Sequence, residues 1–300
     1  MCKVRRFLVT AITLPICIYG AAVGAQPPGN IGVIHWNEGS KHCSAASQPP
    51  LQVNAYNAQT FILRQNPCAS FEANFLYLLI DTGALKDAKA APLLNTVLDL
   101  LPRQGSDRLP LLVVHTHKHL DHRSGDSLFQ AAPGVGLVQA DLASVKSFFG
   151  FTQWPQGAAS LDLGGRVVDV IPAPGHQNCE IVFYDRNSAL LFSGDFLMPG
   201  RLLIENKQTF LESASRIGRF LADRPLTGIY GGHIELSKTG KLYRFGSHYH
   251  PNEHSLELHR EDLANVVEAL EHFNGWYQDQ PNFVLFSARL EFALALEKGL

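Results

Sequence analysis

The feature that most constrains this chain is a dense group of histidines directly after a short apolar run. Residues 111–114 are all leucine or valine, and the eight residues that follow contain four histidines and one aspartate. A short run of this kind, preceded by proline, predicts a buried strand. Buried polar groups must be paired, and imidazole nitrogens and carboxylate oxygens are the ligands that zinc and similar ions prefer. The sequence therefore predicts a metal site on a loop at the end of a buried strand.

The spacing within this loop separates its members. His117 and His119 are two residues apart, so in an extended segment they face the same side and can hold one ion. Asp121 and His122 follow where the chain turns, and they are available for a second ion. His115 still belongs to the strand, so we interpret it as a structural residue.

Four further metal-type ligands stand where other predicted strands end. Asp81 follows the apolar run 75–80, and His176 follows a Pro-Ala-Pro-Gly sequence that cannot continue a strand. Asp195 follows Ser-Gly, and His233 follows Gly-Gly. A single histidine at such a turn is more often an ordinary loop residue. The recurrence of the pattern in one chain predicts that these strand ends meet at the metal site.

The rest of the chain alternates between strand and helix patterns, which predicts an α/β fold. Of the 300 residues, 46% are hydrophobic, which is enough to build a substantial core. Residues 26–55 are rich in Pro, Gly, Ser and Asn and are predicted to form an irregular N-terminal extension. Residues 56–300 are assigned to one domain, with helices expected at 88–101, 124–131, 142–149, 209–222 and 258–273.

Residues 1–25 have the pattern of a signal peptide. A basic start at residues 3–6 precedes an apolar stretch at 7–19, and small residues allow cleavage after Ala25. The stretch is short for a membrane span and is interrupted by Pro15. We therefore expect a periplasmic or secreted protein with no stable membrane association after cleavage. The net charge of −2 offers no basic surface for a phosphate backbone, so a nucleic-acid partner is not expected.

Cleavage would remove Cys2 and Cys17 and leave Cys43, Cys68 and Cys179. An odd number leaves at least one thiol free or bound to another chain. An oxidising compartment permits disulfides, and a Cys43–Cys68 bond would hold the N-terminal extension, although the sequence leaves this pairing open. Cys179 is interpreted as a small buried residue and not as a nucleophile.

The motifs resemble those of the metallo-β-lactamase superfamily. Its signature is His-x-His-x-Asp-His, followed by a single His, a bridging Asp and a last His. The matching residues, within about 61–236, are His117, His119, Asp121, His122, His176, Asp195 and His233. The resemblance implies a four-layer αβ/βα sandwich, in which two mixed β-sheets pack face to face with helices outside. It places the metals at one edge between the sheets.

The resemblance also implies a role for each residue. The first zinc would be held by His117, His119 and His176, and the second by Asp121, His122 and His233, with Asp195 as the bridge. Asp81 would orient ligands from outside this set. The implied cofactor is a pair of Zn²⁺ or other divalent ions sharing a hydroxide that attacks the substrate, with Asp121 as the catalytic residue that orients it and passes on its proton. His119 favours a zinc hydrolase, because the di-iron redox members carry Glu there.

The expected activity is hydrolysis of an ester, thioester, lactone or amide bond in a small molecule. One alternative is a metallo-β-lactamase, since export would place the enzyme where the antibiotic is and residues 198–202 are similar to that subclass. The subclass usually has Ser in place of Asp195, however. Homoserine-lactone hydrolases carry Tyr in place of Met198, and the acidic stretch 253–271 poorly matches the basic end of glutathione thioester hydrolases. A second alternative, disfavoured by the intact ligand set, is a non-catalytic zinc-binding protein of the same fold.

Two features stay open at this level. Residues 247–254 contain candidate substrate contacts, Tyr249 and His254, but the segment could equally be a polar surface loop before the next helix.

Members of the family usually have two strands before the residue that corresponds to Asp81. Residues 71–81 are too short for both, which predicts a trimmed N-terminal sheet. The sequence does not address the oligomeric state.

Overall fold

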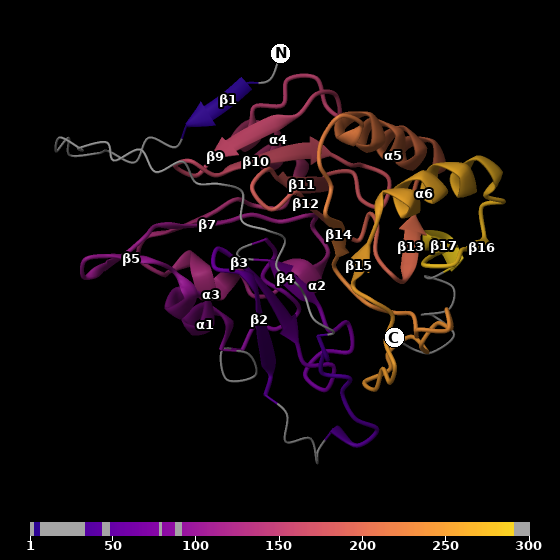
Figure 1. Ribbon diagram of the computed structural model, residues 1–300, viewed down its shortest axis with the longest axis horizontal. Helices are drawn as coiled ribbons and strands as arrows, with labels where there is room; N and C mark the ends of the chain where they lie inside the picture. Colours follow the sequence, from indigo (N-terminus) through magenta and orange to yellow (C-terminus); the bar gives the residue numbers. More distant parts are fainter. Residues whose placement is uncertain (1–2, 7–33, 44–48, 78–79, 88–91, 291–300) are drawn as a thin grey trace.

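The computed structural model describes residues 3–6, 34–43, 49–77, 80–87 and 92–290. Its largest element is a mixed sheet of seven strands (Figure 1). In spatial order the strands are β1 (Lys3–Arg6), β9 (Ala159–Asp162), β10 (Val167–Pro172), β11 (Ile181–Asp185), β12 (Leu190–Gly194), β14 (Gly228–Gly231) and β15 (Glu257–Leu258). The pairs β1–β9 and β12–β14 are parallel and the others are antiparallel.

The N-terminal half forms a second sheet layer. Three strands pair antiparallel, namely β2 (Leu51–Asn57), β3 (Thr60–Gln65) and β4 (Phe75–Tyr77). The strands β7 (Leu111–Val113) and β8 (Val135–Leu137) pair in parallel. Single bridges from Ile80 to Tyr77 and to Val114 connect the two groups, so they form one layer.

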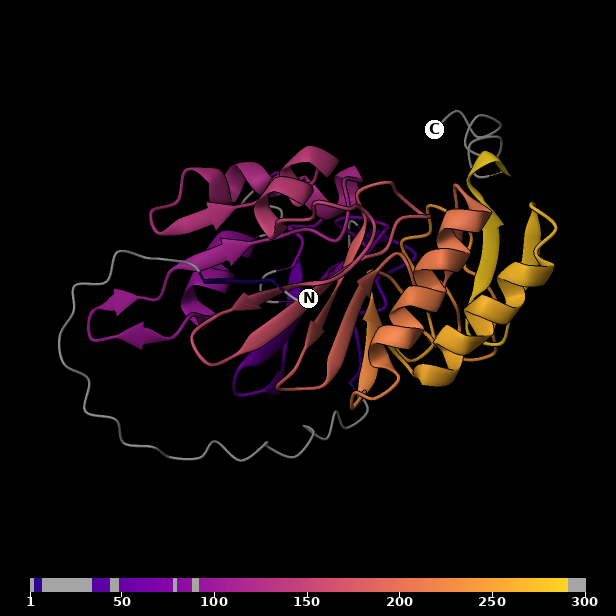
Figure 2. The same ribbon diagram turned by 90° about the horizontal axis from the view of Figure 1, so that it is seen from above.

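Helices cover the outer faces of both layers, and the helix at 142–149 packs into the core between the layers. They are α1 (Leu93–Leu100), α2 (Leu120–Arg123), α3 (Asp126–Gln130), α4 (Leu142–Phe149), α5 (Lys207–Leu221) and α6 (Arg260–His272). The remaining strands are β5 (Arg103–Gln104) and β6 (Asp107–Arg108) in a hairpin, and β13 (Arg201–Ile204), β17 (Val284–Ser287) and β16 (Tyr277–Asp279) in a small mixed sheet. The helices α5 and α6 run side by side against the large sheet (Figure 2).

Alternation along the strands builds the layers, because successive side chains of a strand point to opposite faces. In the large sheet, Val182 and Leu191 pack toward α5 and α6, whereas Phe183 and Phe192 pack toward the second sheet. In β3, Ile62 joins that central core, while its neighbour Leu63 packs against the outer helices. Two mixed layers thus lie between helical layers, which confirms the fold class expected from the sequence.

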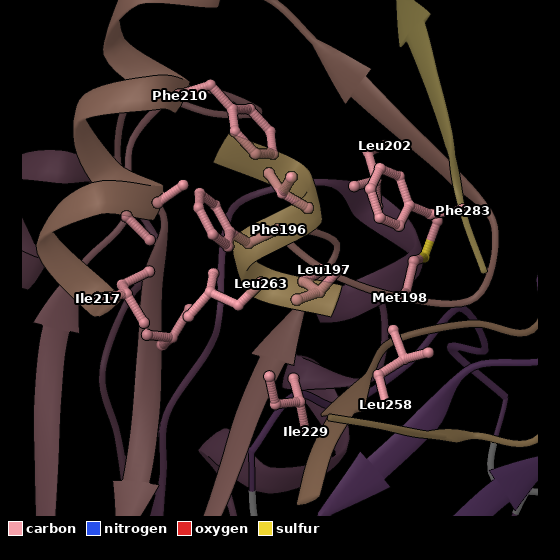
Figure 3. Packing of buried hydrophobic residues seen from close by; sticks show 14 of the residues in the cluster. Phe196, Leu197, Met198, Leu202, Phe210, Ile217, Ile229, Leu258, Leu263 and Phe283 are labelled. Atoms are coloured by element: carbon pink, nitrogen blue, oxygen red, sulfur yellow. The ribbon is translucent and has the colours of Figure 1, made fainter. Parts of the chain in front are cut away.

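The outer core of the large sheet also fixes the chain after Asp195. Phe196, Leu197 and Met198 are all buried and point into a cluster with residues of α5 and α6 (Figure 3). The ring of Phe196 stacks on that of Phe210, with ring centroids 4.5 Å apart. Three successive buried side chains leave the residue before them little freedom to move.

Two expectations about the N-terminal part are wrong. The segment 26–55 is not irregular throughout, because β2 begins at Leu51. The N-terminal sheet is not trimmed, since β2 and β3 supply the strand pair before Asp81. The apolar pattern of β2 is weak because the strand carries Gln52, Asn54 and Asn57 and buries only its end and one tyrosine.

The helix expected at 124–131 is also different. The chain is already helical from Leu120, breaks at Gly125, and continues as α3. The hydroxyl of Ser124 donates to the carbonyl of Leu120 and caps no helix N-terminus. The first part of the helix expected at 88–101 lies outside the described residues, and α1 begins at Leu93.

The structure pairs Cys43 with Cys68 in a disulfide and leaves Cys179 free and buried. Strand β1 lies within the predicted signal peptide, so its removal would make β9 an edge strand. Within the described ranges, no helix combines the length and apolar character needed to cross a membrane.

A buried ion pair connects the N-terminal sheet to the loop after β14. Arg64 is fully buried, and its Nη1 donates to Glu253 Oε2 at 2.6 Å while its guanidinium lies 4.9 Å from the ring centroid of Phe75. We expect Glu253→Ala to lower the free energy of unfolding by about 3–5 kcal/mol, because it leaves a buried charge unpaired. The measurement is urea denaturation, with Glu268→Ala on the exposed face of α6 as the control.

The double variant Arg64→Met, Glu253→Leu should recover most of this loss, because it removes both charges. A loss of under about 1 kcal/mol for Glu253→Ala would contradict the assignment of a buried pair, since exposed pairs contribute that little.

Candidate metal centre

The predicted ligands come together at one edge of the two sheets. His117 and His119 follow β7 and Thr116, and α2 carries Asp121 and His122. The remaining three follow β10, β12 and β14 and are His176, Asp195 and His233. They form two groups, each with ligand atoms within 4.8 Å of one another, namely His117, His119, His176, Asp195 and Asp121, His122, Asp195, His233.

The first group is built from three imidazole nitrogens. His117 Nε2 lies 3.0 Å from His119 Nδ1, and His176 Nε2 lies 3.3 Å and 3.1 Å from these two atoms. Asp195 Oδ2 completes the group at 3.8 Å from His117 Nε2 and 3.7 Å from His176 Nε2.

The second group has two nitrogens and two carboxylate oxygens. His122 Nε2 lies 3.2 Å from His233 Nε2 and 3.3 Å from Asp121 Oδ2. Asp195 directs its other oxygen, Oδ1, into this group, 3.2 Å from His122 Nε2 and 3.4 Å from His233 Nε2. One carboxylate therefore serves both groups.

These spacings fit a bound cation. Ligands about 2.0–2.2 Å from a tetrahedral ion are about 3.3–3.6 Å from each other. The distances within the second group fall close to this range, and those in the first group scatter around it. Asp195 Oδ1 is buried and has no hydrogen-bond partner, which is costly for a charged oxygen unless an ion compensates it. The donor set therefore fits two divalent ions.

Neighbouring acceptors hold the far nitrogens of four of the histidines. His122 Nδ1 lies 2.9 Å from Asp81 Oδ2, and His117 Nδ1 lies 3.0 Å from Thr116 Oγ1. His176 Nδ1 donates to the carbonyl of Leu203 at 3.2 Å, and His233 Nδ1 donates to that of Glu72 at 2.8 Å. The outer nitrogen of each ring thus has its own partner, and the inner nitrogen faces the group, where its lone pair can bind an ion.

Asp81 is the centre of this outer layer. Its Oδ1 accepts the backbone N–H of Thr116 at 2.8 Å, and its Oδ2 accepts the Thr116 hydroxyl at 2.9 Å. Because the hydroxyl donates to Asp81, its lone pair is free to accept from His117. Asp81 has φ of 67°, in the left-handed region that Asp tolerates better than most residues. One buried carboxylate therefore orients ligands of both groups.

Two glycines allow the ligand loops to approach closely. Gly194, directly before Asp195, has φ of 54°, and a Cβ there would lie 2.6 Å from Thr116 Cβ. A Cβ on Gly232 would lie 2.5 Å from Asp195 Oδ1. The N–H of Gly232 donates to the carbonyl of Gly194 at 2.8 Å, which fastens the His233 loop to the Asp195 loop.

The two groups differ in the pKa values of their imidazole and carboxyl side chains. Burial lowers the pKa of His117 well below its usual value, and burial lowers the pKa of His176 to about 4. Burial alone would raise the pKa of Asp195 and Asp121, but the neighbouring His122 and His233 lower the pKa of both carboxyls well below the usual value. Both carboxylates are therefore ionised and the first-group imidazoles are neutral, the forms that bind metal. Burial alone would lower the pKa of His122 and His233, but Asp195 and Asp121 raise the pKa of both well above the usual value, so a bound ion must displace a proton from these two imidazoles.

His115 has the structural role expected from the sequence. It is buried, with Nδ1 3.0 Å from the carbonyl of Val138 and Nε2 2.8 Å from Asp126 Oδ1. The hydroxyl of Thr82 also donates to Asp126, at 2.8 Å. Both ring nitrogens are thus engaged away from the metal groups, and the imidazole fastens the strand end to β8 and α3.

The ligands open into a cavity of about 270 Å³. Segment 243–250 forms one side of it, and residues after β12 form another. The lining residues are Phe71, Glu72, His119, Asp121, Asp195, Met198, Arg201, Leu203, His233, Glu235, Tyr243, Arg244, Phe245, Gly246, Ser247 and His250.

The segment predicted to contact substrate therefore reaches the cavity through other residues. Ser247 and His250 line it, but Tyr249 and His254 do not. Tyr249 pairs through its backbone with Gly39, and His254 Nε2 lies 3.1 Å from Asn282 Oδ1 and faces a separate cavity. Two residues of the predicted segment thus line the cavity, but they are not the two that the sequence singled out.

The sequence of this chain is similar to those of a known protein family. The sequence profile of the metallo-beta-lactamase superfamily matches residues 76–238. The match covers more than half of the chain and includes every one of the predicted ligands. The chain belongs to the metallo-β-lactamase superfamily.

Individual relatives are more distant. The chain is 27% identical to the acyl-coenzyme A thioesterase MBLAC2 of Gallus gallus, over 50% of this chain and 66% of that protein. It is 30% identical to a hydroxyacylglutathione hydrolase of Rhizobium meliloti (strain 1021), over 48% of this chain and 55% of that protein. The chain thus spans between half and two thirds of the length of these relatives.

Among solved structures, a metallo-beta-lactamase from Pontibacter korlensis superposes with a TM-score of 0.51 at 16% identity. The superposition covers 74% of this chain and 100% of that chain. At this identity the likeness shows the fold alone.

The outer carboxylate offers a test of the centre. We expect Asp81→Asn to weaken metal binding about 10–100-fold, because the ligands that Asp81 orients lose a charged acceptor. The measurement is chelator competition on protein whose folding is checked by circular dichroism. Asp99→Asn, which changes an exposed carboxylate of α1, is the control and should bind metal as the wild type does. Equal affinities for both variants would contradict the orienting role.

Proposed function

We propose that this protein is a dinuclear metallohydrolase that cleaves an ester, thioester, lactone or amide bond of a small molecule. The observation that carries the proposal is the Asp195 carboxylate, which directs one oxygen into each of two ligand groups at the floor of a cavity. The proposed ions are Zn²⁺, because three imidazoles and a carboxylate are typical zinc ligands, although another divalent ion could bind the same set.

A pair of divalent ions, when bound, lowers the pKa of a shared water and polarises the bond to be cleaved. The residues of the chain supply the rest. The outer contacts of Asp81, Thr116 and the carbonyls keep the imidazole lone pairs directed inward. Asp121 lines the cavity while its Oδ2 lies 3.3 Å from both His122 Nε2 and His233 Nε2, so it stands beside the centre and near a bound substrate. We assign proton transfer to Asp121.

The cavity walls favour a compact, partly apolar and anionic substrate. Phe71, Met198 and Leu203 supply apolar surface beside the ligands. Arg201 is engaged by Glu235 at 3.2 Å, whereas Arg244 is exposed at the cavity and its guanidinium can meet an anionic group. The name of the chicken relative, a thioesterase, favours thioesters within the proposed set.

We also propose that the protein is exported. The basic and apolar pattern of residues 1–25 supports a cleaved signal peptide. The Cys43–Cys68 disulfide supports an oxidising compartment, since such bonds are rare in the cytosol.

The test is hydrolysis by the mature protein, residues 26–300, loaded with zinc. The substrates are an aryl thioester, an aryl ester, a lactone and a chromogenic cephalosporin. We expect thioester or ester turnover that chelator abolishes and that Asp121→Ala lowers about 10²–10⁴-fold, the usual contribution of a positioned acid–base group. Asp99→Ala serves as the exposed carboxylate control.

Other outcomes identify the alternatives. Turnover of the cephalosporin alone would make the protein a β-lactamase. Two bound zinc ions with no turnover of any substrate would contradict the hydrolase proposal and favour a non-catalytic zinc-binding protein.

A further inference from the structure

Asn74 is a buried amide beside the second ligand group that none of the signature motifs includes. It is the last residue of the loop 66–74 between β3 and β4, and it is fully buried. Its Nδ2 is 3.4 Å from Asp121 Oδ2 and 3.5 Å from His233 Nε2. The spacing between the ligand atoms of that group is nearly the same, at 3.2–3.4 Å.

The backbone around Asn74 fixes this position. Its carbonyl accepts the N–H of Gln65 at 3.0 Å, and the N–H of the next residue, Phe75, donates to the carbonyl of Gly232 at 2.9 Å. Gly232 directly precedes His233, so the amide and the last histidine are held side by side. The preceding residue, Ala73, has φ of 48°, a left-handed conformation that turns the chain into this position.

The amide lacks a partner at its other end. Asn74 Oδ1 is buried and has no hydrogen-bond partner, although a buried amide oxygen normally has one. The two ends of an amide are close to isosteric, so a rotation by half a turn exchanges Oδ1 and Nδ2. A cation in the second group would repel the amide N–H dipole and attract the amide oxygen.

We propose that Asn74 is a ligand of the second metal site, with Oδ1 turned toward the ion. The inference rests on the metal pair of the proposed function and adds a donor to it. The first group would then offer three nitrogens and one oxygen, and the second two nitrogens and three oxygens. Oxygen-rich sets suit harder ions, so the second site would accept Mn²⁺ more readily than the first.

The experiment compares wild-type protein with Asn74→Ala and Asn74→Asp. Metal-free samples receive one and then two equivalents of Co²⁺, and the visible absorption and the affinity for each equivalent are measured. Asn95→Ala, at an exposed position of α1, is the control. We expect Asn74→Ala to weaken the second equivalent about 10–100-fold and to leave the first unchanged.

The spectrum separates a ligand from a merely neighbouring group. Loss of a ligand lowers the coordination number, and cobalt absorbs more strongly with four ligands than with five. The second cobalt of Asn74→Ala should therefore absorb more intensely than that of the wild type. Asn74→Asp, which keeps an oxygen and adds a charge, should retain the wild-type intensity and bind the second ion at least as tightly.

Three results would overturn the inference. Wild-type affinity and spectrum in Asn74→Ala would show that the amide does not participate. Weaker binding with an unchanged spectrum would make Asn74 a hydrogen-bond donor that orients Asp121 and not a ligand. If the wild type binds no second ion, the metal pair itself is wrong, and the inference fails with it. Absent turnover with two ions bound would contradict only the hydrolase proposal.

Discussion

The structure depends on one electrostatic constraint, which is the compensation of the Asp195 carboxylate. Its two oxygens lie in separate groups of ligand atoms, and Oδ1 is buried without a hydrogen-bond partner. Around it, imidazole nitrogens face each other at 3.0–3.3 Å, and the outer nitrogens of four of these rings have partners of their own. Facing lone pairs repel one another, and buried charge is costly, so this arrangement is favourable only with positive charge between the atoms. The proposed pair of divalent cations would satisfy both requirements.

The fold holds these groups together through packing on both sides. Behind Asp195, Phe196 and its two successors are buried against α5 and α6. In front, Gly232 is fastened to Gly194 by a backbone hydrogen bond, and the absence of a side chain permits that contact. On the N-terminal side, Asp81 receives the N–H and hydroxyl of Thr116. The ligands therefore come from elements far apart in the chain, yet none depends on an exposed loop alone.

The ligands could be predicted from the sequence because they share a feature that is visible in the neighbouring residues. Each is a histidine or aspartate in the loop or short helix that follows a buried strand, and glycine or proline marks the strand ends before His176, Asp195 and His233. The residues that hold the outer nitrogens of the histidines have no such feature in their local sequence. The carbonyls of Leu203 and Glu72 can accept from a histidine whatever side chains those residues carry. Asn74 lies 159 residues from its neighbour His233, and no local pattern relates the two.

Local sequence patterns also failed to predict strand β2 and the side-chain directions in segment 243–250, again because contacts between distant residues decide them. Strand β2 buries only Leu51 and Tyr56 and is a strand because β3 pairs with it, so its sequence resembles a loop. Within segment 243–250, the inward direction of His250 follows from the stacking of its ring on Tyr243, with centroids 4.6 Å apart. Tyr249 instead pairs with Gly39 of the N-terminal extension. Both outcomes depend on contacts between distant parts of the chain.

The most direct test of the central claim is to locate the ions. Crystals of the mature protein grown with zinc, with anomalous diffraction measured above and below the zinc absorption edge, would show each ion as a separate peak. We predict two peaks per chain on opposite oxygens of Asp195, one among the first group of ligands and one among the second. A single peak, or no peak between these residues, would contradict the account.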